Sequence, residues 1–102
     1  MVVTFHDLEL DQAKLQEFCR RHRIARLSLF GSVLREDFSP ESDVDVLVEF
    51  LPGARVSLFD VGGMAAELTE MLGREVDLRT AQDLSPYFRD DVLRTARPIY
   101  GV

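Results

Sequence analysis

The sequence predicts a small α/β domain whose mixed sheet has about four strands and is flanked by helices. Two observations support this class. Stretches with apolar residues three and four positions apart, as on one face of a helix, alternate along the chain with short β-branched stretches typical of strands. The chain has 102 residues, 46% of them hydrophobic and 29% charged, which suits one globular domain covering residues 1–102.

Four helical segments are expected. The first covers residues 11–22 and the last begins at Ser85-Pro86, with serine as the N-cap and proline at the first helical position. Between them, a helix over residues 58–72 has apolar residues at steps of three and four and a glycine, Gly73, placed as its C-terminal cap. A short helical turn is expected over residues 33–37.

Four strands are expected between these helices. Residues 25–30 and 75–79 alternate between apolar and polar side chains, which is typical of a half-buried strand. Residues 44–50 are β-branched with a continuous apolar centre, which predicts burial on both faces. Residues 98–102 begin with a proline, so they are assigned to an edge strand.

Two pairs of neighbouring residues, Gly62-Gly63 and Tyr87-Phe88, are predicted to take part in packing. Gly62 and Gly63 lie inside the second long helix, where glycine lowers helical propensity by about 1 kcal/mol relative to alanine. Close packing of this helix against the sheet would explain why they are there. Tyr87 and Phe88 are assigned to the core or to an interface.

The charge of the chain is concentrated in one stretch. The net charge is −6, and residues 36–49 contain six acidic residues and neither lysine nor arginine. This balance disfavours direct nucleic-acid binding.

No apolar run approaches the roughly 18–20 residues that span a bilayer, so no membrane association is expected. A single cysteine, Cys19, excludes an intramolecular disulfide and fits a reducing, cytoplasmic location.

Two aspartates stand at the start of the strongest predicted strand. Asp43 and Asp45 flank Val44, and residues two apart on a strand share a face at roughly 6.5–7 Å. Carboxylates this close repel each other unless a cation lies between them, and Mg²⁺ is bound by one or two carboxylates together with substrate phosphates. The alternative for this pair alone is that both side chains simply face water.

Two further features support a metal and phosphate site. Asp77 lies on the polar face of a second predicted strand, and three carboxylates on adjacent strands would hold two cations, an arrangement used in phosphoryl chemistry. Gly31 and Ser32 follow a strand, where glycine allows close approach of the backbone and serine supplies a hydroxyl donor.

The combination of Gly31-Ser32, Asp43-Val44-Asp45 and the distant Asp77 resembles the polymerase-β-like nucleotidyltransferase superfamily. The resemblance extends over nearly the whole chain. Because the chain is short and has no added domain, it is similar to the minimal nucleotidyltransferases, a small prokaryotic subgroup. Members of this subgroup are often antitoxins paired with a HEPN-domain ribonuclease toxin.

The resemblance implies a role for each motif residue. Gly31 and Ser32 would bind the β- and γ-phosphates of ATP, with Arg35 as a further phosphate contact or, alternatively, as an ion-pair partner of the acidic loop. Asp43, Asp45 and Asp77 would be the catalytic carboxylates and would hold Mg²⁺, with two metal ions expected. Transfer of AMP to a hydroxyl of the toxin, expected to be a tyrosine, would release pyrophosphate.

Other functions stay open. The chain could be an antitoxin that neutralises its toxin by binding alone, or a nucleotidyltransferase for a small molecule such as an aminoglycoside. The absence of a second domain to shape an acceptor pocket argues against the small-molecule function. A hetero-oligomer with the toxin is expected, and a homodimer is an open alternative.

Overall fold

The structure, a computed structural model, describes residues 2–5, 8–34 and 43–101. It measures 37 × 35 × 25 Å along its principal axes. The elements in chain order are β1 Val2–Phe5, β2 Leu8–Asp11, α1 Gln12–Arg21, β3 Ile24–Phe30, the 3₁₀ turn η1 Gly31–Leu34, β4 Val44–Phe50, α2 Leu58–Leu72, β5 Val76–Arg79, the 3₁₀ turn η2 Ala81–Asp83, α3 Arg89–Thr95 and β6 Arg97–Tyr100.

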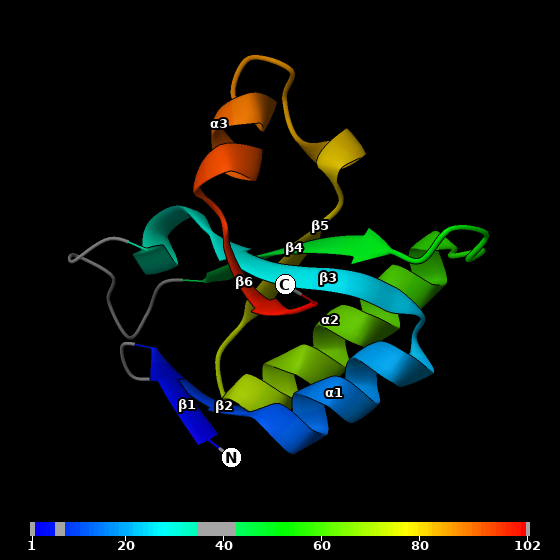
Figure 1. Cartoon of the computed structure of the whole chain (residues 1–102), viewed down its shortest axis with the longest axis vertical. Helices are drawn as coiled ribbons and strands as arrows, with labels where there is room; N and C mark the ends of the chain where they lie inside the picture. Colours follow the sequence, from blue (N-terminus) through cyan, green and yellow to red (C-terminus); the bar gives the residue numbers. More distant parts are fainter. Residues whose placement is uncertain (1, 6–7, 35–42, 102) are drawn as a thin grey trace.

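The main sheet has four strands in the order β5-β4-β3-β6. The pairs β3–β4 and β3–β6 are antiparallel, and β4–β5 is parallel, so the sheet is mixed as predicted. The parallel pair is connected through α2, which lies on one face of the sheet (Figure 1). β6 pairs only with β3 and is therefore an edge strand, where a proline is tolerated.

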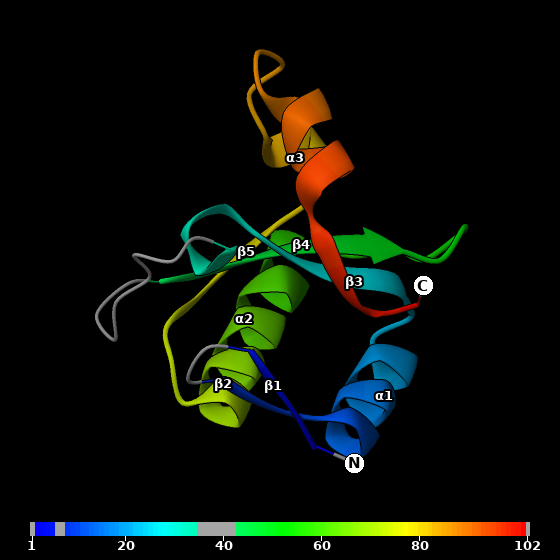
Figure 2. The ribbon, with the colours of Figure 1, turned by 60° about the vertical axis from the view of Figure 1, so that its left-hand side comes forward.

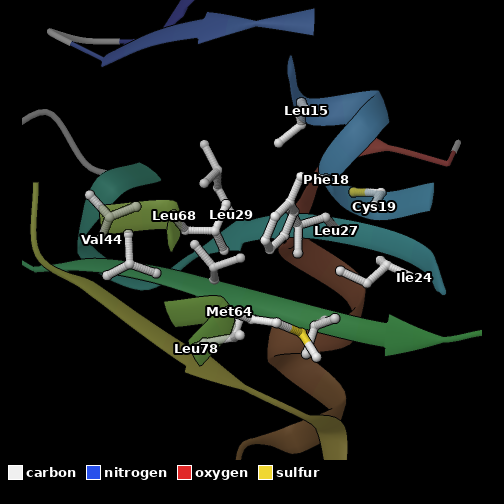
Figure 3. Packing of buried hydrophobic residues seen from close by; sticks show 13 residues of the cluster. Leu15, Phe18, Cys19, Ile24, Leu27, Leu29, Val44, Met64, Leu68 and Leu78 are labelled. Atoms are coloured by element: carbon white, nitrogen blue, oxygen red, sulfur yellow. The ribbon is translucent and has the colours of Figure 1, made fainter. Parts of the chain in front are cut away.

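The two faces of the sheet are covered differently. Helices α1 and α2 lie on one face, and η2 and α3 lie on the other (Figures 1 and 2). The larger core lies between the sheet and the helices α1 and α2 (Figure 3). Its fully buried members include Leu15, Phe18, Leu27, Leu29, Val44, Val46, Met64 and Leu68. A smaller cluster on the opposite face consists of Phe30, Leu47 and Leu84, with Val92 and Ala96 packed against it.

Strand β4 contributes to both cores because successive side chains of a strand point to opposite faces. Val44, Val46 and Val48 belong to the larger core, whereas Leu47 belongs to the smaller one. This is the burial on both faces that the apolar centre of the strand predicts. The residues at positions 45 and 49 share the face of Leu47 but are only partly buried.

The two long helices begin at side-chain caps. The Asp11 carboxylate accepts hydrogen bonds from the backbone N–H groups of Ala13 and Lys14 at 3.0 and 3.3 Å. At α2, Ser57 and Asp60 form a reciprocal capping box, and Gly73 ends the helix in the left-handed conformation at φ +70°. The glycine cap was predicted from the sequence. None of the described helices is long and apolar enough to cross a membrane.

Three features differ from the sequence predictions. The hairpin of β1 and β2 was not predicted; it lies on the helix side of the sheet, near the C-terminal end of α2 (Figures 1 and 2). Helix α3 begins at Arg89 rather than at Ser85, because residues 85–88 form a turn in which the Ser85 carbonyl accepts from two backbone N–H groups. Finally, an added Cβ at Gly62 or Gly63 would meet no atom within 4 Å, so the predicted close packing there is wrong.

Candidate active site

Asp45 and Asp77 are brought together by the parallel pairing of β4 and β5. The two residues are direct partners in the register, and Phe30 of β3 is the partner of Asp45 on its other side. Adjacent strands lie about 4.8 Å apart, so this row places the two carboxylates next to each other on the face opposite α1 and α2. The register is fixed at its start by a 2.8 Å hydrogen bond from the Val44 N–H to the Glu75 carbonyl.

Gly31 lies directly beside the Asp45 carboxylate. It has φ +76°, a left-handed conformation that strongly favours glycine. A Cβ added at this position would overlap the Asp45 Oδ2 atom, because it would lie closer to that atom than real Cβ atoms lie to any neighbour. A side chain at the point where β3 passes into η1 would therefore strain the backbone and displace the Asp45 carboxylate.

The other predicted site residues are placed to different extents. Asp43 directly precedes β4, and its side chain is exposed. Ser32 lies in η1, next to Gly31. Arg35, and most of the turn predicted over residues 33–37, lie outside the described residues; Gly31–Leu34 form the 3₁₀ turn.

A cavity of about 210 Å³ contains the two paired carboxylates. Its charged lining consists of three carboxylates and one guanidinium, so the lining carries an excess of negative charge. Such a cavity favours a cation, or a ligand that arrives with one. The lining residues are Phe30, Asp45, Asp77, Arg79, Asp83, Leu84 and Phe88.

Arg79 neutralises part of this charge through a two-point contact with Asp77. Its Nε donates to Asp77 Oδ1 at 2.9 Å, and an Nη atom donates to Asp77 Oδ2 at 3.1 Å. These hydrogen bonds, followed by the negative charges of Asp77, Asp83 and Asp45, raise the pKa of Arg79 further above its ordinary value. Both oxygens of Asp77 are therefore occupied by a cation of the protein itself.

Asp83 lines the same cavity but has a structural task. Its Oδ2 accepts hydrogen bonds from the backbone N–H and the hydroxyl of Thr80, at 3.0 and 3.1 Å. The backbone contact is the main reason that the pKa of Asp83 is lowered. Asp83 thus holds the start of η2, whereas Asp77 is the carboxylate in register with Asp45.

A wider cavity of about 380 Å³ lies elsewhere, beside Arg21, His22 and Arg23. These residues precede β3, and Gly31 follows it, so the two cavities belong to opposite ends of that strand. The wider cavity contains a single carboxylate, that of Asp60. Although it is wider, it contains no pair of carboxylates, whereas the cavity at Asp45 is lined by two carboxylates that are partners in the strand register.

The smaller cavity fits Mg²⁺ by the chemistry of its donors. Mg²⁺ binds oxygen ligands and commonly uses one or two carboxylates together with substrate phosphates. Asp45 and Asp77 supply such carboxylates, and Asp43 stands two residues from Asp45. No cluster of three His, Cys, Asp or Glu side chains close enough to share a metal ion occurs in the part of the chain that the structure describes. A third ligand would thus come from the substrate or from a rearranged side chain.

Sequence reasoning missed two parts of this cavity. Arg79 stands two residues after Asp77 on the same strand, so alternation alone could have placed both on one face. Phe88 reaches the cavity from the turn before α3. No local pattern could have revealed this, since it depends on how that turn folds over the sheet.

Comparisons with known proteins agree with the geometry. The family profile of the nucleotidyltransferase domain matches residues 12–99. A protein of Methanocaldococcus jannaschii assigned as a protein adenylyltransferase, MJ0435, is 41% identical over 76 residues, which cover 74% of this chain and 80% of that protein.

Solved structures with the same fold include a minimal nucleotidyltransferase. It is 35% identical, with a TM-score of 0.70, and the alignment covers 86% of this chain and 88% of that one. A toxin–antitoxin complex with AMP-PNP gives a TM-score of 0.71 at 21% identity, covering 91% of this chain and 75% of that one. A complex of a tri-AMPylated Shewanella oneidensis HEPN toxin with an MNT antitoxin gives a TM-score of 0.62 at 20% identity, covering 89% and 70%. The latter two likenesses concern the fold alone.

The predicted α/β class and the predicted resemblance are therefore confirmed by independent findings. The profile covers most of the chain, the archaeal relative exceeds 40% identity over three quarters of it, and the four-stranded mixed sheet is that of the solved minimal nucleotidyltransferase. The chain belongs to the nucleotidyltransferase domain family and is a nucleotidyltransferase.

Proposed function

We propose that this chain is a Mg²⁺-dependent adenylyltransferase that transfers AMP from ATP to a tyrosine hydroxyl of a HEPN-domain toxin and thereby acts as its antitoxin. The observation that carries the proposal is the pairing of Asp45 with Asp77 in one cavity, with Gly31 directly beside Asp45. The similarity to a protein adenylyltransferase, and the shared fold with an antitoxin in complex with an AMPylated HEPN toxin, support this choice of reaction and partner.

ATP would enter at the end of β3. We assign Gly31 and Ser32 to the β- and γ-phosphates, and Arg35 to a further phosphate contact. The missing side chain of Gly31 lets the Asp45 carboxylate lie against the backbone that we assign to the phosphates. The AMP-PNP complex of a protein with this fold supports ATP as the donor.

Asp43, Asp45 and Asp77 would hold Mg²⁺ at this site. The ion would neutralise the phosphate charge that develops as pyrophosphate leaves. Asp45 lies in the cavity with Gly31 beside it, so the same side chain can face the phosphates and the cation. Asp77 would serve the acceptor side of the reaction once Arg79 releases one of its oxygens.

The transfer would be a single in-line displacement. The acceptor oxygen forms a bond to the α-phosphorus, the bond between that phosphorus and the bridging oxygen to the β-phosphorus breaks, and pyrophosphate leaves. We assign the acceptor proton to Asp77, whose carboxylate lies in the same row as Asp45. Most of the rate enhancement would come from positioning and charge neutralisation, as in other phosphoryl transfers.

Mass spectrometry of the acceptor tests this proposal. The chain is incubated with ATP, Mg²⁺ and a HEPN-domain protein encoded beside it, and the intact mass of that protein is measured. We expect one or more added AMP groups, and their loss with Asp45→Asn or Asp77→Asn. Asp91→Asn is the matched control, because Asp91 is exposed on α3, pairs with Arg94 at 2.6 Å and does not line the carboxylate cavity.

Three results would contradict the proposal. Absence of any added mass, with the chain folded and the toxin bound, would leave an antitoxin that acts by binding. Full neutralisation of the toxin in cells by Asp45→Asn, with transfer abolished, would show that chemistry is not what neutralises it. AMP added to a small-molecule alcohol instead of the protein would favour the small-molecule transferase.

A further inference from the structure

Two neighbouring aromatic residues in the turn before α3 are exposed, and one of them lines the carboxylate cavity. Tyr87 is 97% exposed and Phe88 is 49% exposed. Phe88 is also one of the residues that line the cavity with Asp45 and Asp77. The turn therefore carries an exposed aromatic pair, in which Phe88 borders the cavity and Tyr87 is the preceding residue of the chain.

The turn that carries this pair is held in place. The Ser85 carbonyl accepts from the N–H groups of Phe88 and Arg89 at 3.2 and 2.9 Å. The Ser85 hydroxyl accepts from the Tyr87 N–H at 3.3 Å. The Arg89 guanidinium donates to the carbonyls of Ala81 and Leu84 at 2.7 and 2.9 Å, which ties α3 to η2.

This turn is also anchored to the sheet beneath it. Leu84 is buried in the smaller core with Phe30 and Leu47, and Phe30 is the strand partner of Asp45. The position of the aromatic pair relative to the two carboxylates is thus fixed by packing and by hydrogen bonds. The two rings are exposed because the fold holds this turn out over the sheet (Figure 1).

Exposed rings beside a reacting centre suit a protein acceptor better than the nucleotide base. Tyr87 is almost fully exposed, so it lines no pocket that could enclose a base, whereas protein interfaces are enriched in exposed tyrosine and phenylalanine. A hydroxyl on a protein can reach this cavity only if the segment that carries it crosses the cavity mouth. An acceptor tyrosine adds an aromatic ring, which pairs favourably with other rings.

We propose that Tyr87 and Phe88 form the docking edge for the acceptor segment of the partner protein, a segment with an aromatic hydroxyl flanked by apolar residues. This inference rests on the proposed function, because it assumes that the partner supplies the acceptor. Phe88 guides the acceptor ring toward Asp77, and Tyr87 packs on the apolar neighbours of that ring. The edge selects the acceptor and leaves ATP binding unchanged.

Steady-state kinetics of AMP transfer test the docking edge. With Tyr87→Ala or Phe88→Ala, we expect KM for the partner protein to rise about tenfold, as when an interface hot spot is truncated. KM for ATP should not change. Tyr87→Phe should restore the wild-type KM for the partner, because the ring is kept. The matched control is Phe59→Ala, since Phe59 is 92% exposed at the start of α2 and does not line the carboxylate cavity.

Calorimetric titration of the partner without ATP gives a second readout that needs no catalysis. Weaker binding of the partner by Tyr87→Ala, with unchanged binding by Phe59→Ala, supports the docking edge even if the wild-type chain transfers no AMP. Absence of transfer by the wild-type chain would contradict only the proposed function. Active transfer with an unchanged KM for the partner in both alanine variants would overturn the edge. So would a rise in KM for ATP alone, which would assign the rings to the base. Phe88→Leu keeps the apolar volume, in case Phe88→Ala fails to fold.

Discussion

Replacing Gly31 by alanine tests the geometry of the site most directly. The change imposes two penalties, one from the backbone and one from the new Cβ. At φ +76°, a residue with a Cβ is destabilised by about 1–2 kcal/mol, because the side chain crowds the following carbonyl. For a domain of this size, each kcal/mol lowers the melting temperature by about 4–8 °C. The new Cβ would also overlap Asp45 Oδ2, so the carboxylate must move.

Gly53→Ala separates these two effects. Gly53 has φ +84°, so alanine carries a similar backbone penalty there, but an added Cβ at Gly53 meets no atom within 4 Å. We expect both variants to melt several degrees below wild type in thermal denaturation. Only Gly31→Ala should lose AMP transfer, by about 100-fold, since a displacement near 1 Å at a reacting centre has that effect.

Gly31→Ala with full transfer activity would refute the reasoning. It would mean that Asp45 adapts without functional consequence, or that Asp45 does not act in the reaction. Equal losses of activity in Gly31→Ala and Gly53→Ala would point instead to general destabilisation. Assays at a temperature well below both melting transitions exclude that explanation, because both variants are then folded.

Three further predictions concern stability and reactivity. Gly62→Ala and Gly63→Ala should each raise the free energy of unfolding by about 0.5–1 kcal/mol, because both glycines are helical and an added Cβ meets open space; a lower melting temperature would reveal unrecognised packing. Burial raises the pKa of Cys19 to about 12, so iodoacetamide at neutral pH should label this thiol only after unfolding, and rapid labelling of the native chain would contradict its burial. The hydrogen bond from Arg21 is the main reason that the pKa of Glu67 lies below its ordinary 4.5. The ionised Glu67 carboxylate therefore stabilises the fold at pH values above its ordinary pKa, and this contribution is lost as the pH falls through its lowered pKa. Glu67→Gln should flatten the acid side of a curve of stability against pH. An unchanged curve would show that the pair of Arg21 and Glu67 contributes nothing measurable.

Local patterns in the sequence were sufficient for the main elements. The apolar periodicity of α1 and α2, the β-branched run of β4 and the glycine after α2 each depend on neighbours a few residues away. The hairpin of β1 and β2 was missed, although Leu8–Asp11 alternates between apolar and polar residues as β5 does. The late start of α3 also escaped prediction. Ser85-Pro86 is equally suited to a helix start and to a turn, and contacts of the following residues decide between them.

The site itself was predictable only in part. Spacing along a strand indicates that Asp45 and Asp77 lie on polar faces, but their pairing depends on the register that the crossover through α2 produces. Gly31 was read as a site of close backbone approach, and the structure identifies the Asp45 carboxylate as the group that approaches it. Tyr87 and Phe88 were assigned to core or interface; their exposure excludes the core and leaves the interface as the open assignment.

Arg79 changes how the acidity of the site is understood. Three carboxylates share one cavity, and the guanidinium of Arg79 already occupies both oxygens of one of them, Asp77. A cation that binds Asp45 and Asp77 together must therefore share Asp77 with Arg79 or displace it. The backbone of Asp77 is held by its strand pairing with Asp45, whereas the Arg79 side chain is exposed. If such a cation binds, we expect the Arg79 guanidinium to move, because the strand pairing of Asp45 with Asp77 holds the backbone of both carboxylates in register.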